Sequence, residues 1–195
     1  NKKFALKCEE AGVDAIVAEG FEAGGHNGRE ETTTMVLIPI IREATNLPLI
    51  AAGGIASGSS MVAGFALGAE AVQMGTRFVA SVESSGHESF KSKVVNSEEG
   101  ETMLMLKQLT PVRLMRNKFF NQIAEAEAKG SSVEELKLIL GRARAKKGMF
   151  EGDMEEGELE IGQVSAAVRK IIPAGEIVKE VWNEFLEAKS RISNL

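Results

Sequence analysis

The chain has 195 residues, 44% of them hydrophobic and 26% charged, with a formal net charge of −5. This length fits one domain with a sizeable core, and the negative charge argues against a nucleic-acid partner, because no basic patch dominates. No stretch approaches the ~20 apolar residues that a membrane-spanning helix needs, so we expect no membrane partner.

The number of cysteines limits which crosslinks and which cellular compartment are expected. Cys8 is the single cysteine, which excludes a disulfide within the chain and a cluster of thiolate metal ligands. Its place in a helical pattern predicts a buried, inert thiol, and we expect a reducing, cytoplasmic compartment. Because the sequence opens at Asn1 inside that helical pattern, we also expect that an N-terminal portion of the protein precedes it.

The first 80 residues alternate helical patterns with short apolar strands. A helix is expected over residues 3–11, a second is capped by Thr32 or Thr33 and ends before Pro48, and a third covers residues 57–67. Strands are expected over residues 15–18, 49–52 and 71–74. Continuous apolar strands joined by helices predict an α/β fold whose parallel sheet is covered on both faces.

After about residue 80 the pattern becomes helical. Residues 81–195 show no further clear strand, and amphipathic helices are expected over residues 89–95, 112–128, 133–145, 163–172 and 174–188. We interpret residues 1–80 as the βα units with the site and residues 81–195 as a helical extension. A basic run at residues 142–147 precedes an acidic stretch at 151–160, and we expect the two to balance each other on the surface.

Each of the three strands ends in glycine. Gly24 and Gly25 follow the first strand, Gly53 and Gly54 the second, and Gly75 with Thr76 the third. Ligands of parallel sheets bind at the carboxyl ends of the strands, where glycine lets backbone N–H groups approach a phosphate. Tight turns alone would also use glycine, but two such pairs in consecutive units favour a phosphate site over that structural interpretation.

His26 is the one plausible acid–base side chain near these glycines, and an imidazole suits proton transfer at neutral pH. We expect it in a mobile polar loop. Glu19 and Glu22 bracket the same loop and could contact a flavin or pair with Arg29, with Glu19 the better candidate. His87 is expected to be structural or solvent-exposed, and two distant histidines make a zinc site improbable.

Three motifs carry a resemblance to a known family. They are Glu19-Gly20-x-Glu22-Ala23-Gly24-Gly25-His26-x-Gly28, Ala51-Ala52-Gly53-Gly54-Ile55 and Gln73-Met74-Gly75-Thr76-Arg77-Phe78. Together they resemble the FMN-dependent nitronate monooxygenase family, which includes the bacterial type II enoyl-acyl-carrier-protein reductases. The resemblance is best over residues 11–80 and implies the C-terminal part of a (β/α)₈ barrel, strands six to eight, with the helical extension following.

The resemblance also implies roles for single residues. Gly53, Gly54, Gly75 and Thr76 would hold the FMN phosphate, while Glu19, Gly24, Gly25, Gln73 and Met74 would line the flavin. His26 matches the family's active-site histidine. The redox chemistry would be that of the flavin, with NADH or NADPH as reductant in a reductase.

Alternatives remain open at this stage. Glu19 favours the reductase, because many nitronate monooxygenases carry glutamine there, and residues 109–113 and 162–164 also fit reductase-like members. The substrate would then be an enoyl group on an acyl-carrier protein; in a monooxygenase it would be a small alkyl nitronate. A non-catalytic binding protein and a relative of inosine-monophosphate dehydrogenase rank lower, the latter because Cys8 lies in a helix rather than a loop. We expect a homodimer.

Overall fold

The computed structural model describes residues 1–194 and contains a parallel three-stranded sheet formed by its first half. The strand order is β1-β3-β4, and Ile16 pairs with Leu49 while Ala51 pairs with Val72. The strands and their helices are α1 (Lys2–Glu10), β1 (Ile16–Glu19), α2 (Thr34–Arg42), β3 (Leu49–Ala52), α3 (Gly58–Ala66) and β4 (Ala71–Gln73). Alternating strand and helix in these residues is confirmed.

The core of this half forms where α2 packs on the sheet. Ile38 and Ile41 of α2 are buried with Leu49 and Ala51 of β3. Of the strands β1 and β3, only β3 has both faces largely buried. In β1 buried and exposed residues alternate, and Val17 is 48% exposed. The expected cover on both faces is therefore wrong for β1, because the described helices cover only one of its faces.

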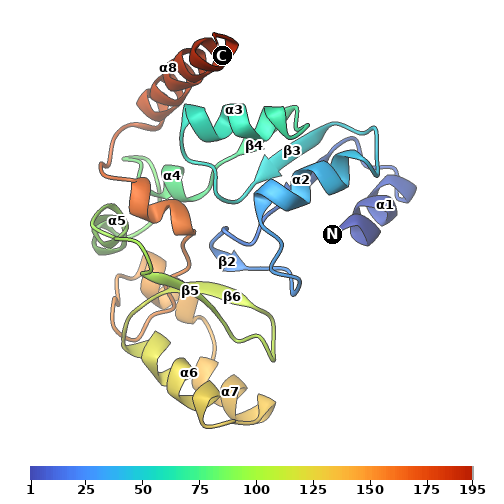
Figure 1. Cartoon of the computed structure of the whole chain (residues 1–195). Helices are drawn as coiled ribbons and strands as arrows, with labels where there is room; N and C mark the ends of the chain where they lie inside the picture. The colour runs from blue at the N-terminus through green and yellow to red at the C-terminus, as the bar shows by residue number, and fades with distance from the viewer. Residues whose placement is uncertain (195) are drawn as a thin grey trace.

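A second sheet lies beneath the first (Figure 1) and was not expected from the sequence. It is antiparallel, in the order β2-β6-β5, with β2 (Gly25–His26), β5 (Thr102–Met105) and β6 (Val112–Met115). The expectation of no clear strand after residue 80 is wrong. So is the loop expected around His26, since β2 is hydrogen-bonded to β6 with His26 opposite Val112.

Of the helices expected after residue 80, those over 112–128, 133–145 and 163–172 are shorter in the structure, and the one over 89–95 is present at its full length. The helical elements that follow β4 are α4 (Thr76–Val79), α5 (Glu88–Val95), α6 (Lys118–Ala128), α7 (Val133–Leu140), a π-helical turn η1 (Lys146–Phe150) and a 3₁₀ turn η2 (Gln163–Ala167). Residues 112–115 are strand rather than the start of a helix, because β6 has all four side chains buried between β2 and β5. At Gly141 the backbone turns with a φ of 63° and ends α7 before residue 145.

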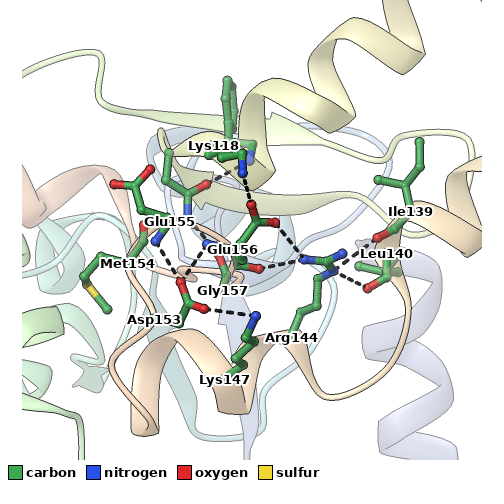
Figure 2. Close-up of polar contacts among 12 residues, drawn as sticks. Lys118, Ile139, Leu140, Arg144, Lys147, Asp153, Met154, Glu155, Glu156 and Gly157 are labelled. Atoms are coloured by element: carbon green, nitrogen blue, oxygen red, sulfur yellow. Dashed lines mark hydrogen bonds and ion pairs between the residues drawn. The ribbon is translucent and has the colours of Figure 1, made fainter.

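The segment after α7 is held by a network around Arg144 (Figure 2). The Arg144 guanidinium donates to the carbonyl oxygens of Ile139 (3.1 Å), Leu140 (2.9 Å) and Glu156 (2.7 Å). Lys147 pairs with Asp153 at 2.9 Å, so the basic and acidic runs do balance each other. Hydrogen bonds from the Glu156 backbone and from Lys147 lower the pKa of Asp153 to about 2.

The last helix, α8 (Ala174–Ser193), returns to lie along α3 (Figure 1). Gly58 at the start of α3 donates its backbone N–H to Glu184 of α8 at 2.8 Å, which satisfies one of the free N–H groups of that helix end. At the other end of the chain, Cys8 is exposed rather than buried, because α1 buries only Ala5. Within residues 1–194, none of the helices combines the length and apolar character needed to cross a bilayer.

Candidate functional site

A cavity of about 230 Å³ lies at the carboxyl ends of all three parallel strands. We call it the glycine cavity. Its wall joins the ends of β1, β3 and β4 to the segment that precedes η2, so it is built from both halves of the chain. The residues that line it include Glu19, Glu22, Gly24, Gly53, Gly54, Gln73, Gly75, Thr76, Glu160 and Gly162.

Backbone geometry explains the glycines after β3. Gly53 and Gly54 have φ values of +81° and +71°, which residues with a side chain rarely adopt. A Cβ atom on Gly53 would also lie 2.5 Å from the carbonyl oxygen of Gly20. In the described part of the chain, no hydrogen bond engages the N–H groups of Gly53 and Gly54. These two N–H groups are therefore available to an anion.

The turn after β4 contributes open space and a hydroxyl. A Cβ atom on Gly75 would meet nothing within 4 Å, so the backbone here borders empty cavity. The hydroxyl oxygen of Thr76 accepts a hydrogen bond from the Gly162 backbone N–H at 3.1 Å. Its own proton is then free to be donated to a ligand. Gln73 also lines the cavity and is exposed.

Two carboxylates lie at the rim with different tasks. Burial raises the pKa of Glu19, which faces the cavity from the end of β1. The Glu22 carboxylate accepts the Thr34 backbone N–H at 3.1 and 3.0 Å and so caps α2. Glu22 does not pair with Arg29, which donates instead to the carbonyl oxygens of Lys107 and Leu109.

His26 lines a second cavity, of about 280 Å³, which we call the histidine cavity. Its other walls are mostly apolar and include Leu106, Leu109, Val112 and Leu140. His26 itself is exposed and lies outside the lining of the glycine cavity. His87 lines neither cavity, is exposed as expected, and caps α5 by accepting the Ser89 N–H at 3.2 Å.

Three of the sequence candidates, His26, Gly25 and Met74, lie outside the lining of the glycine cavity. Met74 packs against the core of the parallel sheet, and Gly25 is buried. Gly24 does line the cavity, and the backbone of Ile161 and Gly162 passes close to it. A Cβ atom on Gly24 would lie 2.6 Å from the Gly162 nitrogen, so this glycine is needed for the close approach of two backbones.

Sequence reasoning missed Arg113 and Glu160. Arg113 of β6 is 2% exposed and donates to the Phe21 carbonyl oxygen from Nε (3.1 Å) and Nη2 (2.7 Å), which fixes the loop that ends β1. Burial lowers the pKa of this guanidinium, against the opposing charge of Glu22. Arg113 lies in the segment 109–113 and Glu160 in the segment 158–164. What each contacts becomes visible only when these segments are paired with residues 21–26.

The glycine cavity fits the phosphate end of a flavin nucleotide. Unpartnered N–H groups at Gly53 and Gly54, open space before Gly75 and the Thr76 hydroxyl together form a cradle of donors. In residues 1–194 no three His, Cys, Asp or Glu side chains are placed to hold a metal ion. The arrangement therefore suits an anion bound by backbone donors.

Comparison with known proteins agrees with this geometry. The model of the nitronate monooxygenase family matches residues 2–184. A probable nitronate monooxygenase of Staphylococcus aureus (strain MSSA476) is 34% identical over 92% of this chain and 53% of its own length. A nitronate monooxygenase of Paraburkholderia phytofirmans is 32% identical over 96% of this chain and 53% of its own.

Two solved structures are similar along nearly the whole chain. FabK from Thermotoga maritima superposes with a TM-score of 0.93 at 40% identity, covering 100% of this chain and 61% of FabK. The nitroalkane oxidase of Streptomyces ansochromogenes gives a TM-score of 0.79 at 32% identity, covering 98% and 57%.

The chain belongs to the nitronate monooxygenase family. Its structural neighbours are TIM-barrel enzymes, so the parallel sheet described above is part of such a barrel. The chain spans about half the length of the curated relatives that it matches.

Proposed function

We propose that this chain supplies the phosphate-binding and substrate-facing part of an FMN-dependent enoyl-acyl-carrier-protein reductase. The observation that carries the proposal is the convergence of three strand ends on one cavity with unpartnered backbone donors. Strands β1, β3 and β4 would be the sixth, seventh and eighth of the barrel. The similarity to FabK at 40% identity and the glutamate at position 19 support the reductase.

The residues of this chain would bind and orient. The N–H groups of Gly53 and Gly54 and the Thr76 hydroxyl would hold the phosphate, and Glu19 and Gln73 would face the flavin from the strand ends. His26 would donate a hydrogen bond to the thioester carbonyl of a substrate whose acyl chain lies against the apolar wall of the histidine cavity. When bound, FMN supplies the hydride-carrying redox chemistry.

The overall reaction balances without a further reactant. NAD(P)H loses a hydride, and the enoyl double bond gains that hydride and one proton. The proton comes from solvent or from a group that exchanges with it, such as the imidazole of His26. The enoyl group is the electron acceptor and no O₂ is consumed, which separates this reaction from the second candidate.

The second candidate is oxidation of alkyl nitronates with O₂ as the electron acceptor. The family model and the names of the curated relatives favour it. The same phosphate cradle serves both reactions, so the two candidates differ in what enters the histidine cavity and in what reduces the flavin.

Anaerobic flavin reduction separates the candidates. The full-length holoenzyme is mixed with NADH or NADPH, and loss of the visible flavin absorbance is followed; separate portions then receive crotonyl thioester or propyl nitronate. A reductase should be reduced rapidly by a nicotinamide and reoxidised by the thioester. Reduction by the nitronate with no response to either nicotinamide would establish the monooxygenase, and a purified protein without flavin would reject both.

A further inference from the structure

Glu160 occupies a unique place between the two cavities. In the described chain it is the one residue that lines both the glycine cavity and the histidine cavity. Its carboxylate makes no hydrogen bond or ion pair with other side chains of residues 1–194. A half-buried carboxylate without a partner is costly unless a charged group or ligand faces it.

The backbone fixes Glu160 next to His26. Along one edge of β6, His26 is opposite Val112, Gly25 is opposite Arg113, and Glu160 bridges to Leu114. The Met115 N–H donates to the Leu159 carbonyl oxygen at 2.8 Å, which locks this register.

Both side chains line the histidine cavity. Positions 112 and 114 are two residues apart on β6, so the backbones of their partners His26 and Glu160 lie about 7 Å apart along the edge.

Gly25 clears the space between the two side chains. A Cβ atom on Gly25 would lie 2.5 Å from Oε2 of Glu160, so the carboxylate lies over this glycine. The positive φ of Gly25, +74°, also favours glycine at this position. A side chain here would displace the Glu160 carboxylate.

The charged groups around this pair are few. The histidine cavity is lined by His26, Arg144, Glu158 and Glu160, and the glycine cavity adds Glu19 and Glu22. Arg144 is committed to three carbonyl oxygens and to Glu156 (Figure 2). Burial raises the pKa of Glu160, and the charge of His26 acts in the opposite direction.

We propose that Glu160 is a positioning residue for His26: the charge of its carboxylate, on the same cavity wall, favours an orientation of the imidazole toward the junction of the two cavities. The role toward substrate rests on the proposed function, but the electrostatic interaction between the two side chains does not.

The electrostatic interaction can be tested without catalysis, in the full-length protein. NMR follows the ring C–H resonances of His26 and His87 against pH, with the His26→Gln variant used for assignment. In Glu160→Gln the titration midpoint of the His26 resonances should move to lower pH than in the natural protein, because an opposing charge is lost. His87 serves as the internal reference, and Glu155→Gln, an exposed carboxylate of the same segment, is the matched control.

Kinetics test the positioning role. With the substrate that proves active, Glu160→Gln should lower kcat about tenfold or more with a smaller change in KM, as expected for lost orientation of a general acid. Glu160→Asp, which keeps the charge on a shorter side chain, should restore the NMR titration and part of kcat. If Glu160→Gln does not fold, Glu160→Asp must still lower kcat relative to the natural protein.

The two proposals can fail separately. An unchanged His26 titration together with a kcat within about twofold of the natural protein would overturn the role of Glu160. A shifted titration in a protein that turns over neither crotonyl thioester nor propyl nitronate would instead reject the proposed function and keep the pair.

Discussion

At the scale of single residues, the glycine cavity depends on where a side chain has room. Gly54 is a poor site for a test, because its φ of +71° would strain any replacement and a Cβ atom would contact Glu22 at 3.4 Å. Gly75 has an ordinary φ of −90° and faces empty space. A substitution at Gly75 therefore alters the cavity with little change to the fold.

Gly75→Val should reduce the flavin that copurifies with the protein about tenfold or more, which corresponds to at least ~1.4 kcal/mol of lost binding. The added isopropyl group would occupy the space before the phosphate cradle. Flavin content is measured by absorbance and the unfolding temperature by circular dichroism. Gly175→Val is the matched control, since Gly175 also borders open space but lies on α8. Full flavin content in Gly75→Val would refute the cradle.

Glu158 links pH to stability. Burial and the nearby Glu160 raise the pKa of Glu158 to about 7, against the charge of Arg144. The folded protein then binds more protons than the unfolded chain between about pH 4.5 and 7, so stability falls as pH rises through this window and levels off above it.

The substitution Glu158→Gln should remove this loss of folding stability at higher pH. Urea unfolding should show the variant more stable than the natural protein at pH 8, by about 1–2 kcal/mol after allowance for solvent screening, and no more stable at pH 4.5. Glu155→Gln should follow the natural protein at both values. Parallel stability curves for Glu158→Gln and the natural protein would contradict the buried, protonated state.

At the scale of elements, sequence patterns identified the parallel βα units and not the antiparallel sheet. Strands β1 and β3 are apolar runs that end in glycine, which is a local signal. β2 has two residues, and β6 carries Arg113 inside a buried strand, so neither has the period of a strand. Their pairing depends on residues more than 80 positions apart, which no local pattern records.

The same limit applies to the site. Glycines after β1, β3 and β4 could be predicted because the strand ends of a parallel sheet converge. Glu160 could not, because its place beside His26 follows from the bridge between Leu114 and residue 160. The sequence correctly placed Gly24 in the loop that borders the site. Its close approach to Gly162 is a packing requirement that only the structure reveals.

Arg144 holds in place the segment that contains Glu158 and Glu160, through its hydrogen bonds to backbone carbonyl oxygens. Arg144→Lys should destabilise the protein by about 1–3 kcal/mol, since an ammonium cannot match the geometry of three carbonyl acceptors and of stacking on Phe119 at 4.5 Å. Thermal unfolding measures the effect. Arg142→Lys, an exposed arginine two residues away, should leave the melting temperature unchanged. Equal melting temperatures for the two variants would contradict this stabilising role of Arg144.

At the scale of the whole molecule, α8 ties the end of the chain to the barrel strands through α3. The backbones approach so closely at Gly58 that a Cβ atom would lie 2.5 Å from Cβ of Glu184 and closer still to the backbone of residue 185. Arg77, which follows the phosphate turn, pairs with Glu180 of α8 at 3.2 Å. The C-terminal helix is therefore tied to the residue that follows Thr76 in the wall of the glycine cavity.

Gly58→Ala should displace α8 and cost about 1–3 kcal/mol, because backbone rather than a movable side chain is in the way. Trp182, stacked on Phe185 with ring centroids 5.2 Å apart, reports the displacement by its fluorescence. Gly64→Ala in the same helix should stabilise by ~0.5–1 kcal/mol, since its Cβ would make ordinary contacts of 3.4–3.8 Å. An unaltered tryptophan spectrum in Gly58→Ala would show that α8 is not held there.

The wall of the glycine cavity joins residues 19–24 to residues 160–164, with the Gln163 N–H donating to the Glu22 carbonyl oxygen at 2.9 Å. Closing a loop of that length is a late and entropically expensive event in folding. During synthesis the parallel strands leave the ribosome well before the segment that completes the wall. Under the proposed function, flavin uptake would begin only after the chain has doubled back on itself, and the bound flavin would mark molecules whose folding has finished.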